Sequence, residues 1–294
     1  MIINLSSSSA PAKLGASNFI LHETGFRHHW EGVGALSLKS FFKGQALYEV
    51  GNGRYRIDAR SFLLLNHHQP YRITLDAGQA AESFCLFFAE GFAEEVQRSL
   101  TTATRRLLDE PELRATASLQ FFERTYPREA LLSPVLARMR GVLLQKHYAR
   151  GWMQEQFHLL MQQLLQVQRG AYKEAAALPA ARAATREELY RRLHRARDFM
   201  QASWQQPLAL EELARVACLS PNHFLRSFRQ LFHQTPHQYL TALRLAQARH
   251  LLTHTEHTVT DICFALGFES LGSFSLLCAK HLGASPSRYR RQKK

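Results

Sequence analysis

The sequence predicts an α+β chain of two domains, one rich in β-strands and one entirely helical. Polar and apolar residues alternate from about Ala35 to Ala89, whereas apolar residues recur every three or four positions after Gly91. The length of 294 residues suits about two domains. We expect a flexible tail over 1–17, a first domain over 18–172, a linker over 173–186 and a second domain over 187–294.

The excess positive charge lies mainly in the last third of the chain. The protein has 37 Lys and Arg residues against 24 Asp and Glu. From Tyr190 to Lys294 there are 15 basic residues and only 6 acidic ones. Such a concentration of positive charge favours a polyanionic partner such as double-stranded DNA. The apolar runs are too short to span a membrane, and the N-terminus does not resemble a signal peptide. The four cysteines are widely spaced, which argues against a disulfide scaffold. We therefore expect a cytoplasmic protein without a membrane partner.

The strand pattern predicts a sandwich or small barrel of about six strands. Tyr55 and Ile57 alternate with arginines, whereas residues 62–65 and 84–88 are continuous apolar runs typical of strands buried on both faces. Aromatic and polar side chains in this region would either line a site for a small-molecule effector or form ordinary core. These residues are Trp30, Phe41, Tyr48, Tyr55, His67 and Tyr71.

Three helices are expected next, over 92–100, 128–149 and 152–172. In the last of them, apolar residues recur at alternating spacings of four and three, as in a coiled-coil seam. They are Met153, Phe157, Leu160, Leu164, Val167 and Ala171. The seam fits either the interface of a homodimer or packing within its own domain. Pro179 then predicts a break, and Thr185 with Glu188 has the spacing of a capping box that would begin a new helix.

The segment 208–232 has the pattern of a helix-turn-helix. Ser220 is a good N-cap before Pro221, and the following helix has an apolar face containing Phe224 and Phe228. Its other face carries Asn222, Leu225, Arg226 and Arg229. Arg226 has the geometry to bind a guanine edge and Asn222 an adenine edge in the major groove. An ordinary surface helix with arginines is the alternative.

A second copy of the pattern follows, with helices over 258–266 and 271–281 separated by Gly267-Phe268. Phe274 and Cys278 are expected to face inward. Gly272, Ser273, Leu276 and Lys280 are expected to face outward, and the repeat from Asn222 to Ser273 is 51 residues. Two such units joined by a helix over 236–253 form a far more specific pattern than one.

These residues resemble the AraC/XylS family of bacterial transcription regulators over residues 187–292. The matching stretches are Ser220-x-x-His223-Phe224-x-Arg226-x-Phe228-Arg229, Thr235-Pro236-x-x-Tyr239-Leu240, Arg244-Leu245-x-x-Ala248-x-x-Leu251-Leu252, Ile262-Cys263-x-x-x-Gly267-Phe268-x-Ser270 and Gly283-x-Ser285-Pro286-x-x-Tyr289-Arg290. The resemblance implies two recognition helices in successive major grooves, with contacts that include Ser220, His223 and Ser270. It also implies an N-terminal cupin-like β-barrel with a helical pair that senses an effector and dimerises, RNA polymerase as a partner, and activation of transcription.

The sequence departs from the family at three positions. Leu276 stands where the family usually has a polar reader, Cys278 replaces a usual Phe, and Gln234 lies where a Gly commonly ends the helix. Leu276 can touch a thymine methyl but cannot pair with guanine. We therefore expect the first recognition helix to supply most of the base recognition.

Two other functions remain open at this stage. One is a metal-dependent cupin-like enzyme, with ligands drawn from the adjacent pairs His28-His29 and His67-His68 together with His22 or Glu82. Neighbours in a strand point to opposite faces, so each pair offers one inward ligand at most. The other is a ligandless DNA-binding regulator whose barrel only dimerises. Since the sequence shows no nucleophile, phosphate-binding or dinucleotide motif, we expect no enzyme activity and no cofactor.

Overall fold

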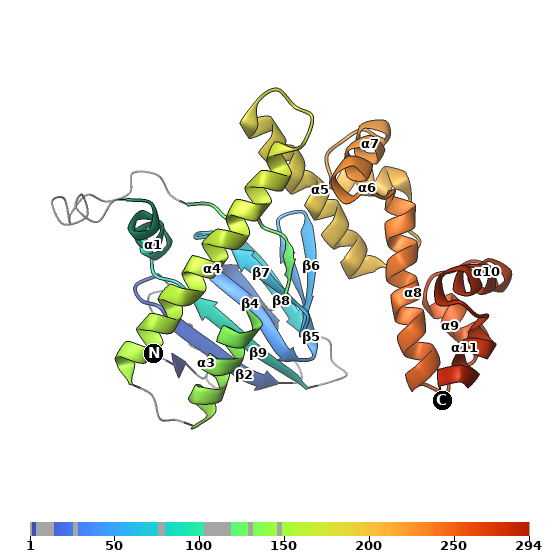
Figure 1. Ribbon diagram of the computed structural model, residues 1–294, viewed down its shortest axis with the longest axis horizontal. Coiled ribbons are helices and arrows are strands. Elements are labelled where there is room, and N and C mark those ends of the chain that lie inside the picture. The colour runs from blue at the N-terminus through green and yellow to red at the C-terminus, as the bar shows by residue number, and fades with distance from the viewer. Residues whose placement is uncertain are drawn as a thin grey trace. The chain divides into compact units, whose positions relative to one another are not determined.

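The computed structural model describes residues 2–3, 15–25, 29–75, 80–102, 119–128, 132–145 and 149–293. The chain divides into two units, Met1–Arg191 and Arg192–Lys294. The first is a β-domain with helices and the second is entirely helical (Figure 1), so the α+β expectation is confirmed. The expected tail, 1–17, falls mostly outside the described residues, and the domain limits stay predictions.

The first unit contains two sheets. The 6-stranded sheet has the order β1-β2-β9-β4-β7-β10, and the 4-stranded sheet has the order β3-β8-β5-β6. β1 and β2 pair in parallel, and the other pairs are antiparallel. The strands are β1 (Ile2–Ile3), β2 (Phe19–Gly25), β3 (His29–Val33), β4 (Ser37–Lys43), β5 (Gln45–Val50), β6 (Gly53–Asp58), β7 (Ser61–Leu65), β8 (Pro70–Leu75), β9 (Ala81–Phe87) and β10 (Thr125–Pro127).

Residues 35–89 do contain six strands, β4 to β9, as the alternation predicts. The prediction missed β1, which lies in the expected tail, as well as β2, β3 and β10. β10 has only three residues, too few for a period to show, and β3 contains Gly32, which interrupts the apolar alternation. β3 is also an edge strand, so little of it needs to be buried.

The 6-stranded sheet has a core on each face because successive side chains of a strand point to opposite sides. On one face, Leu38, Leu64 and Leu86 pack with the helices of this unit. On the other face, Phe41 and Leu63 pack with residues of the 4-stranded sheet such as Tyr48. This explains why β7 and β9 are apolar on both faces.

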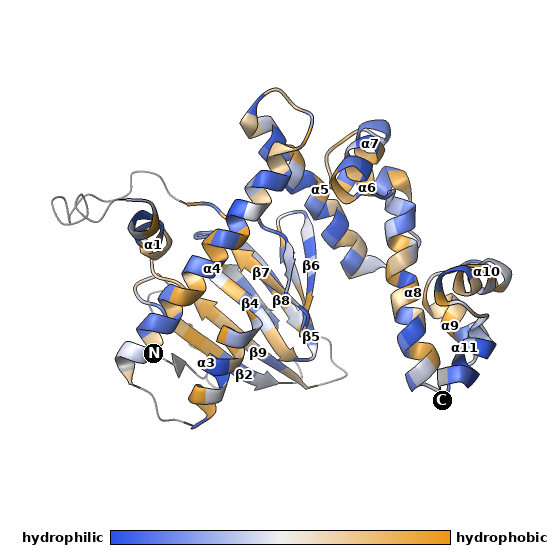
Figure 2. Ribbon diagram, in the orientation of Figure 1, coloured by the Kyte–Doolittle hydropathy of each residue, from blue (hydrophilic) through white to orange (hydrophobic). Residues whose placement is uncertain are grey.

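Three described helices accompany the sheets: α1 (Phe92–Thr101), α3 (Ser133–Gln145) and α4 (Arg150–Ala176). α3 and α4 lie across the 6-stranded sheet (Figure 1), and Figure 2 shows hydrophobic residues concentrated on the strands behind them. α4 is longer than expected and α3 is shorter. Residues 129–131 and 146–148, which belong to the expected helix 128–149, lie outside the described residues.

The regular seam of α4 packs inside its own unit, the alternative that the spacing left open. Phe157, Leu160 and Leu164 are buried in the core between helices and sheet, and Met153 and Val167 pack against that core. A second chain has no access to the three buried side chains, so this structure corrects the dimer-interface prediction. The 3.5-residue spacing describes which face is apolar and does not identify what covers it.

The second unit and the helix that enters it consist of α5 (Ala183–Ser203), α6 (Leu210–Val216), α7 (Pro221–Phe232), α8 (Pro236–His254), α9 (Val259–Ala265), α10 (Leu271–Leu282) and α11 (Pro286–Lys293). α5 begins before Thr185, which corrects the capping-box prediction there. One face of α5 is apolar and buried, and it contains Leu193, Ala196 and Met200. Residues 177–182, which include Pro179, separate α4 from α5.

Candidate nucleic-acid interface

The first helix-turn-helix consists of α6, a tight turn and α7. Cys218 in the turn has a left-handed backbone with φ of 51°. The side chain of Ser220 caps α7 by accepting a hydrogen bond from the backbone N–H of His223 at 3.4 Å, and Pro221 occupies the first turn. Phe224 and Phe228 are buried, which fixes the inner face of α7. Cap, proline and apolar spacing therefore position this helix as the sequence predicts.

The opposite face of α7 is exposed. It presents Asn222, His223, Leu225, Arg226 and Arg229. Neither guanidinium on this face forms an ion pair or hydrogen bond with any described residue. By contrast, Arg244 on α8 donates to the carbonyl oxygens of Trp204 and Gln206, at 2.9 Å each, and is committed to holding the fold. α7 thus carries uncommitted donors on a helix whose other face is fixed.

α7 ends at His233, whose φ of 56° places it in the left-handed region. The left-handed residue that ends the helix is therefore His233, one residue before Gln234, which has no positive φ. α8 then begins with a complete capping box, in which Thr235 and Gln238 exchange side-chain and backbone hydrogen bonds. These two features set the sharp turn between α7 and α8.

The second helix-turn-helix is built in the same way. Thr258 and Asp261 form a capping box at the start of α9, and Ser270 caps α10 by accepting from the N–H of Ser273 at 3.3 Å. Phe274 and Cys278 are fully buried, and burial raises the pKa of the Cys278 thiol to about 12, so it stays protonated. Buried Cys263, and not the exposed Ala265, completes the inner face of α9 with Ile262.

The outward face of α10 has little charge. Gly272, Ser273, Leu276 and Lys280 are exposed there, as is the cap residue Ser270. Leu276 is 74% exposed, an unusual value for a leucine, and neighbouring Leu271 is 40% exposed. Phe264 on α9 is 57% exposed and was not predicted to lie on the surface. The signal available in the sequence was that Phe264 falls outside the apolar spacing of its helix.

The two units repeat at 50 residues, which corrects the spacing of 51. The caps Ser220 and Ser270, the core residues Phe224 and Phe274, and the left-handed residues His233 and Gly283 all differ by 50. Arg226 therefore corresponds to Leu276. The two recognition helices thus have equivalent caps, core residues and helix ends, but their exposed faces differ.

A glycine allows the second turn to pack closely. Gly267 has φ of 75°, and a Cβ there would lie 2.6 Å from the carbonyl oxygen of Gln205 and 2.8 Å from the Arg244 guanidinium. Any other residue would have to displace backbone, so this position holds α9 and α10 against the end of α5.

In the first unit, five of the six expected effector-binding residues lie together, and one of them is Phe41. Tyr48, Tyr55 and Tyr71 are buried between the two sheets, and Trp30 packs against them. His67 lies apart in the turn after β7, where its Nδ1 accepts a hydrogen bond from the N–H of Leu36 at 3.2 Å. Burial lowers the pKa of His67, so the ring is the neutral acceptor that this bond requires.

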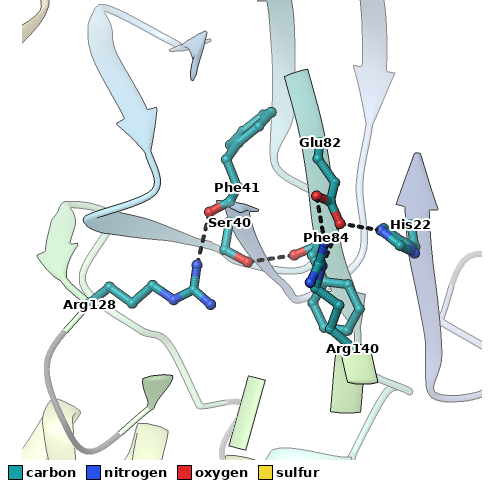
Figure 3. A network of polar contacts seen from close by, with 7 residues as sticks. All are labelled: His22, Ser40, Phe41, Glu82, Phe84, Arg128 and Arg140. Atoms are coloured by element: carbon teal, nitrogen blue, oxygen red, sulfur yellow. Dashed lines mark hydrogen bonds and ion pairs between the residues drawn. The ribbon is translucent and has the colours of Figure 1, made fainter. Parts of the chain in front are cut away.

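The expected metal ligands do not gather. His22 bonds Glu82 at 2.8 Å, but the Glu82 carboxylate also accepts two bonds from Arg140 of α3 (Figure 3). His29 is exposed on β3, and His28 lies outside the described residues. Within the described ranges, no group of three or more His, Cys, Asp and Glu side chains has a metal-binding arrangement.

Together these features define a class of protein: a β-domain with helices joined to a double helix-turn-helix domain. Comparison with known proteins agrees. Residues 19–126 match the AraC-like ligand binding domain family, and residues 213–292 match a helix-turn-helix domain family. The chain belongs to the AraC family.

Individual relatives match about a third of this chain. The melibiose operon regulatory protein of Escherichia coli (strain K12) is 31% identical over 32% of this chain and 31% of its own length. The HTH-type transcriptional activator RhaS of Yersinia pestis (strain Pestoides F) is 35% identical over 34% of this chain and 37% of its own. The matched stretch thus spans about a third of these relatives.

Among solved structures, the DNA-binding domain of AdpA, a global transcriptional factor in complex with a target DNA, is 29% identical. That match covers 34% of this chain and 90% of the other, with a TM-score of 0.33. Among the described residues, no helix is both long and apolar enough to cross a membrane.

Proposed function

We propose that this protein is a sequence-specific DNA-binding transcription regulator that acts in the cytoplasm as an activator and a homodimer. The exposed face of α7 carries this proposal. Arg226 and Arg229 project from a helix that is capped at its start and packed on its other side. A rigid helix with free guanidiniums is what major-groove recognition requires.

The chemistry of each contact follows from the side chains. Arg226 donates two hydrogen bonds to O6 and N7 of a guanine, and Asn222 pairs with N6 and N7 of an adenine. Arg229 and His223 meet phosphates, as do the N-terminal turns of α7 and α10 at Ser220 and Ser270.

α10 contributes differently, because Leu276 replaces an arginine in the repeat. It makes apolar contact with a thymine methyl, and Ser273 and Lys280 bind at the edge of the groove. α7 therefore supplies most of the base recognition, and α10 mainly sets the register on the next turn of the duplex.

Regulation is assigned to the first domain. The match to the AraC-like ligand binding domain family supports a small-molecule effector over a purely dimerising barrel. An effector shifts the protein towards the state that it binds better, which favours one arrangement of the domains on DNA and on RNA polymerase. The similarity to RhaS, a transcriptional activator, supports activation, and no catalytic step is needed.

The test is DNA binding by fluorescence anisotropy, with the duplex upstream of the protein's own gene against a scrambled duplex. We expect the wild type to prefer the upstream duplex by about 10³ or more. Arg226→Ala should weaken specific binding by about 1–3 kcal/mol and relax the preference at one base pair.

Arg249→Ala is the matched control, since Arg249 is an exposed arginine of α8 and so lies outside both recognition helices. It should reduce affinity for both duplexes by the same small factor. Equal binding of the wild type to the two duplexes, or an Arg226→Ala variant with unchanged base preference, would overturn the proposal.

A further inference from the structure

A lysine is buried in the middle of the first domain. Lys39 lies on β4 and is only 2% exposed. It shares the face of β4 that carries Phe41, which points between the two sheets. Lysine is almost never fully buried without a partner, so the position needs a physical account.

The contacts of Lys39 are mostly with aromatic rings. Its ammonium donates a hydrogen bond to the Tyr71 hydroxyl at 2.9 Å, which connects β4 to β8 of the opposite sheet. It also lies 3.9 Å from the ring centroid of Phe87 and 4.8 Å from that of Tyr71. Within the described part of the chain, no carboxylate pairs with it. Glu23 acts electrostatically on the nearby Tyr48 and Cys85.

This arrangement leaves the charge incompletely compensated. An ammonium has three N–H donors, and only one has a hydrogen-bond acceptor among the described residues. Cation–π contacts recover part of the desolvation cost, but a buried cation is fully stabilised only by an anion with hydrogen bonds. An apolar side chain of similar length would fill this space at lower cost. The lysine is thus better suited to binding than to stability.

We propose that Lys39 binds the anionic group of the effector, a small monocarboxylate with an apolar body, between the two sheets of the first domain. The inference specifies the effector of the proposed function, and it stands on the contacts of Lys39 alone.

The surroundings specify this chemistry. One ammonium matches one negative charge, and the hydroxyl of Tyr71 is positioned to donate to the same carboxylate. Tyr48 lies beside it, with ring centroids 6.0 Å apart. Burial raises the pKa of Tyr48, and its hydroxyl hydrogen-bonds to Cys85. The aromatic rings of Phe87 and Trp30 offer a largely apolar surface, which suits an apolar body better than a polyanion.

Trp30 also indicates the route of entry. It is partly exposed on the edge strand β3, and its ring packs on Tyr71 with centroids 4.6 Å apart. A carboxylate that moves these two rings reaches Lys39 without crossing the core around Phe41.

The experiment is a thermal-shift and calorimetric titration of the full-length protein with straight-chain and aromatic monocarboxylates of two to ten carbons. Each is compared with its uncharged amide. We expect at least one carboxylate, and not its amide, to raise Tm, because a ligand that binds only the native state stabilises it. Lys39→Met should weaken that binding at least tenfold. Lys43→Met is the matched control, since Lys43 is exposed on the same strand.

The variants also separate a binding role from a structural one. Without carboxylate, Lys39→Met should have a Tm equal to or above that of the wild type, whereas a lower Tm would make the ammonium a structural group and overturn the proposal. It would also be overturned if no carboxylate shifted Tm or if Lys39→Met bound normally. DNA binding by α7 is measured separately, so either proposal can fail while the other holds.

Discussion

Glu82 shows how one side chain joins three elements of the first domain. Its carboxylate on β9 accepts two hydrogen bonds from Arg140 of α3, at 2.5 and 2.9 Å, and one contact with His22 of β2 at 2.8 Å (Figure 3). The pKa of the Glu82 carboxyl is lowered, mainly by the hydrogen bond from Arg140 and against the opposing effect of burial. The Arg140 guanidinium also lies over the Phe42 ring.

This predicts a pH-dependent contribution to stability. A carboxyl whose pKa is lower in the folded state stabilises that state above its unfolded pKa, near 4.5, and loses the effect as pH falls through the folded value. Glu82→Gln should therefore lower the free energy of unfolding by about 1–3 kcal/mol at pH 7 and flatten the acid limb below pH 4.5.

Urea titrations at several pH values measure both effects. Glu31→Gln is the control, because Glu31 pairs with Arg72 on an exposed surface and its loss should matter little. An unchanged acid limb in Glu82→Gln would contradict the assignment.

His233 carries a cost that its counterpart avoids. Both His233 and Gly283 end a recognition helix in the left-handed region, at φ of 56° and 79°. Only glycine adopts this conformation freely. We expect His233→Gly to raise the free energy of unfolding by about 1 kcal/mol and Gly283→His to lower it by a similar amount. Thermal unfolding followed by circular dichroism measures both, and shifts of the same sign would contradict the backbone explanation.

At the scale of elements, the accuracy of sequence-based prediction depends on whether the cause is local. Ser220, Pro221 and the spacing of Phe224 and Phe228 predicted α7 correctly, because caps and faces are set within one turn. The partner of α4 could not be predicted in this way. Lys39 was also missed, because a lysine in a strand normally reaches solvent and only the pairing of two sheets encloses this one.

α4 offers a test of what covers its seam. Leu164 is fully buried against the sheet, so Leu164→Ala should lower the free energy of unfolding by about 2–5 kcal/mol without changing the oligomeric mass. Leu159 on the same helix is 38% exposed, and Leu159→Ala should have a much smaller effect. Unfolding and light scattering measure the two quantities. A change of oligomeric mass with stability intact would restore the dimer seam.

At the scale of the whole molecule, the uneven charge of the chain fits the uneven roles of its domains. The excess of basic residues after Tyr190 indicates, before any motif does, the domain that we propose to bind DNA. The proposed contact residues on α7 could be named from the sequence because a recognition helix occupies a short stretch. The proposed effector site combines strands from distant parts of the chain, so only the folded sheets bring its residues together.

The strand pairing of the first domain has a consequence for the order in which the two domains fold during synthesis. Phe19 pairs with Phe87 and Leu63 with Thr125, whereas α6 and α7, like α9 and α10, meet neighbours in the chain. Folding slows as contacting residues become more distant in sequence. The β-domain is synthesised first, but its larger sheet cannot be completed until β10 has been synthesised. The helical domain, by contrast, assembles from contacts between neighbouring helices. A newly made chain therefore completes its recognition helices on a shorter time scale than the domain that we propose to control them.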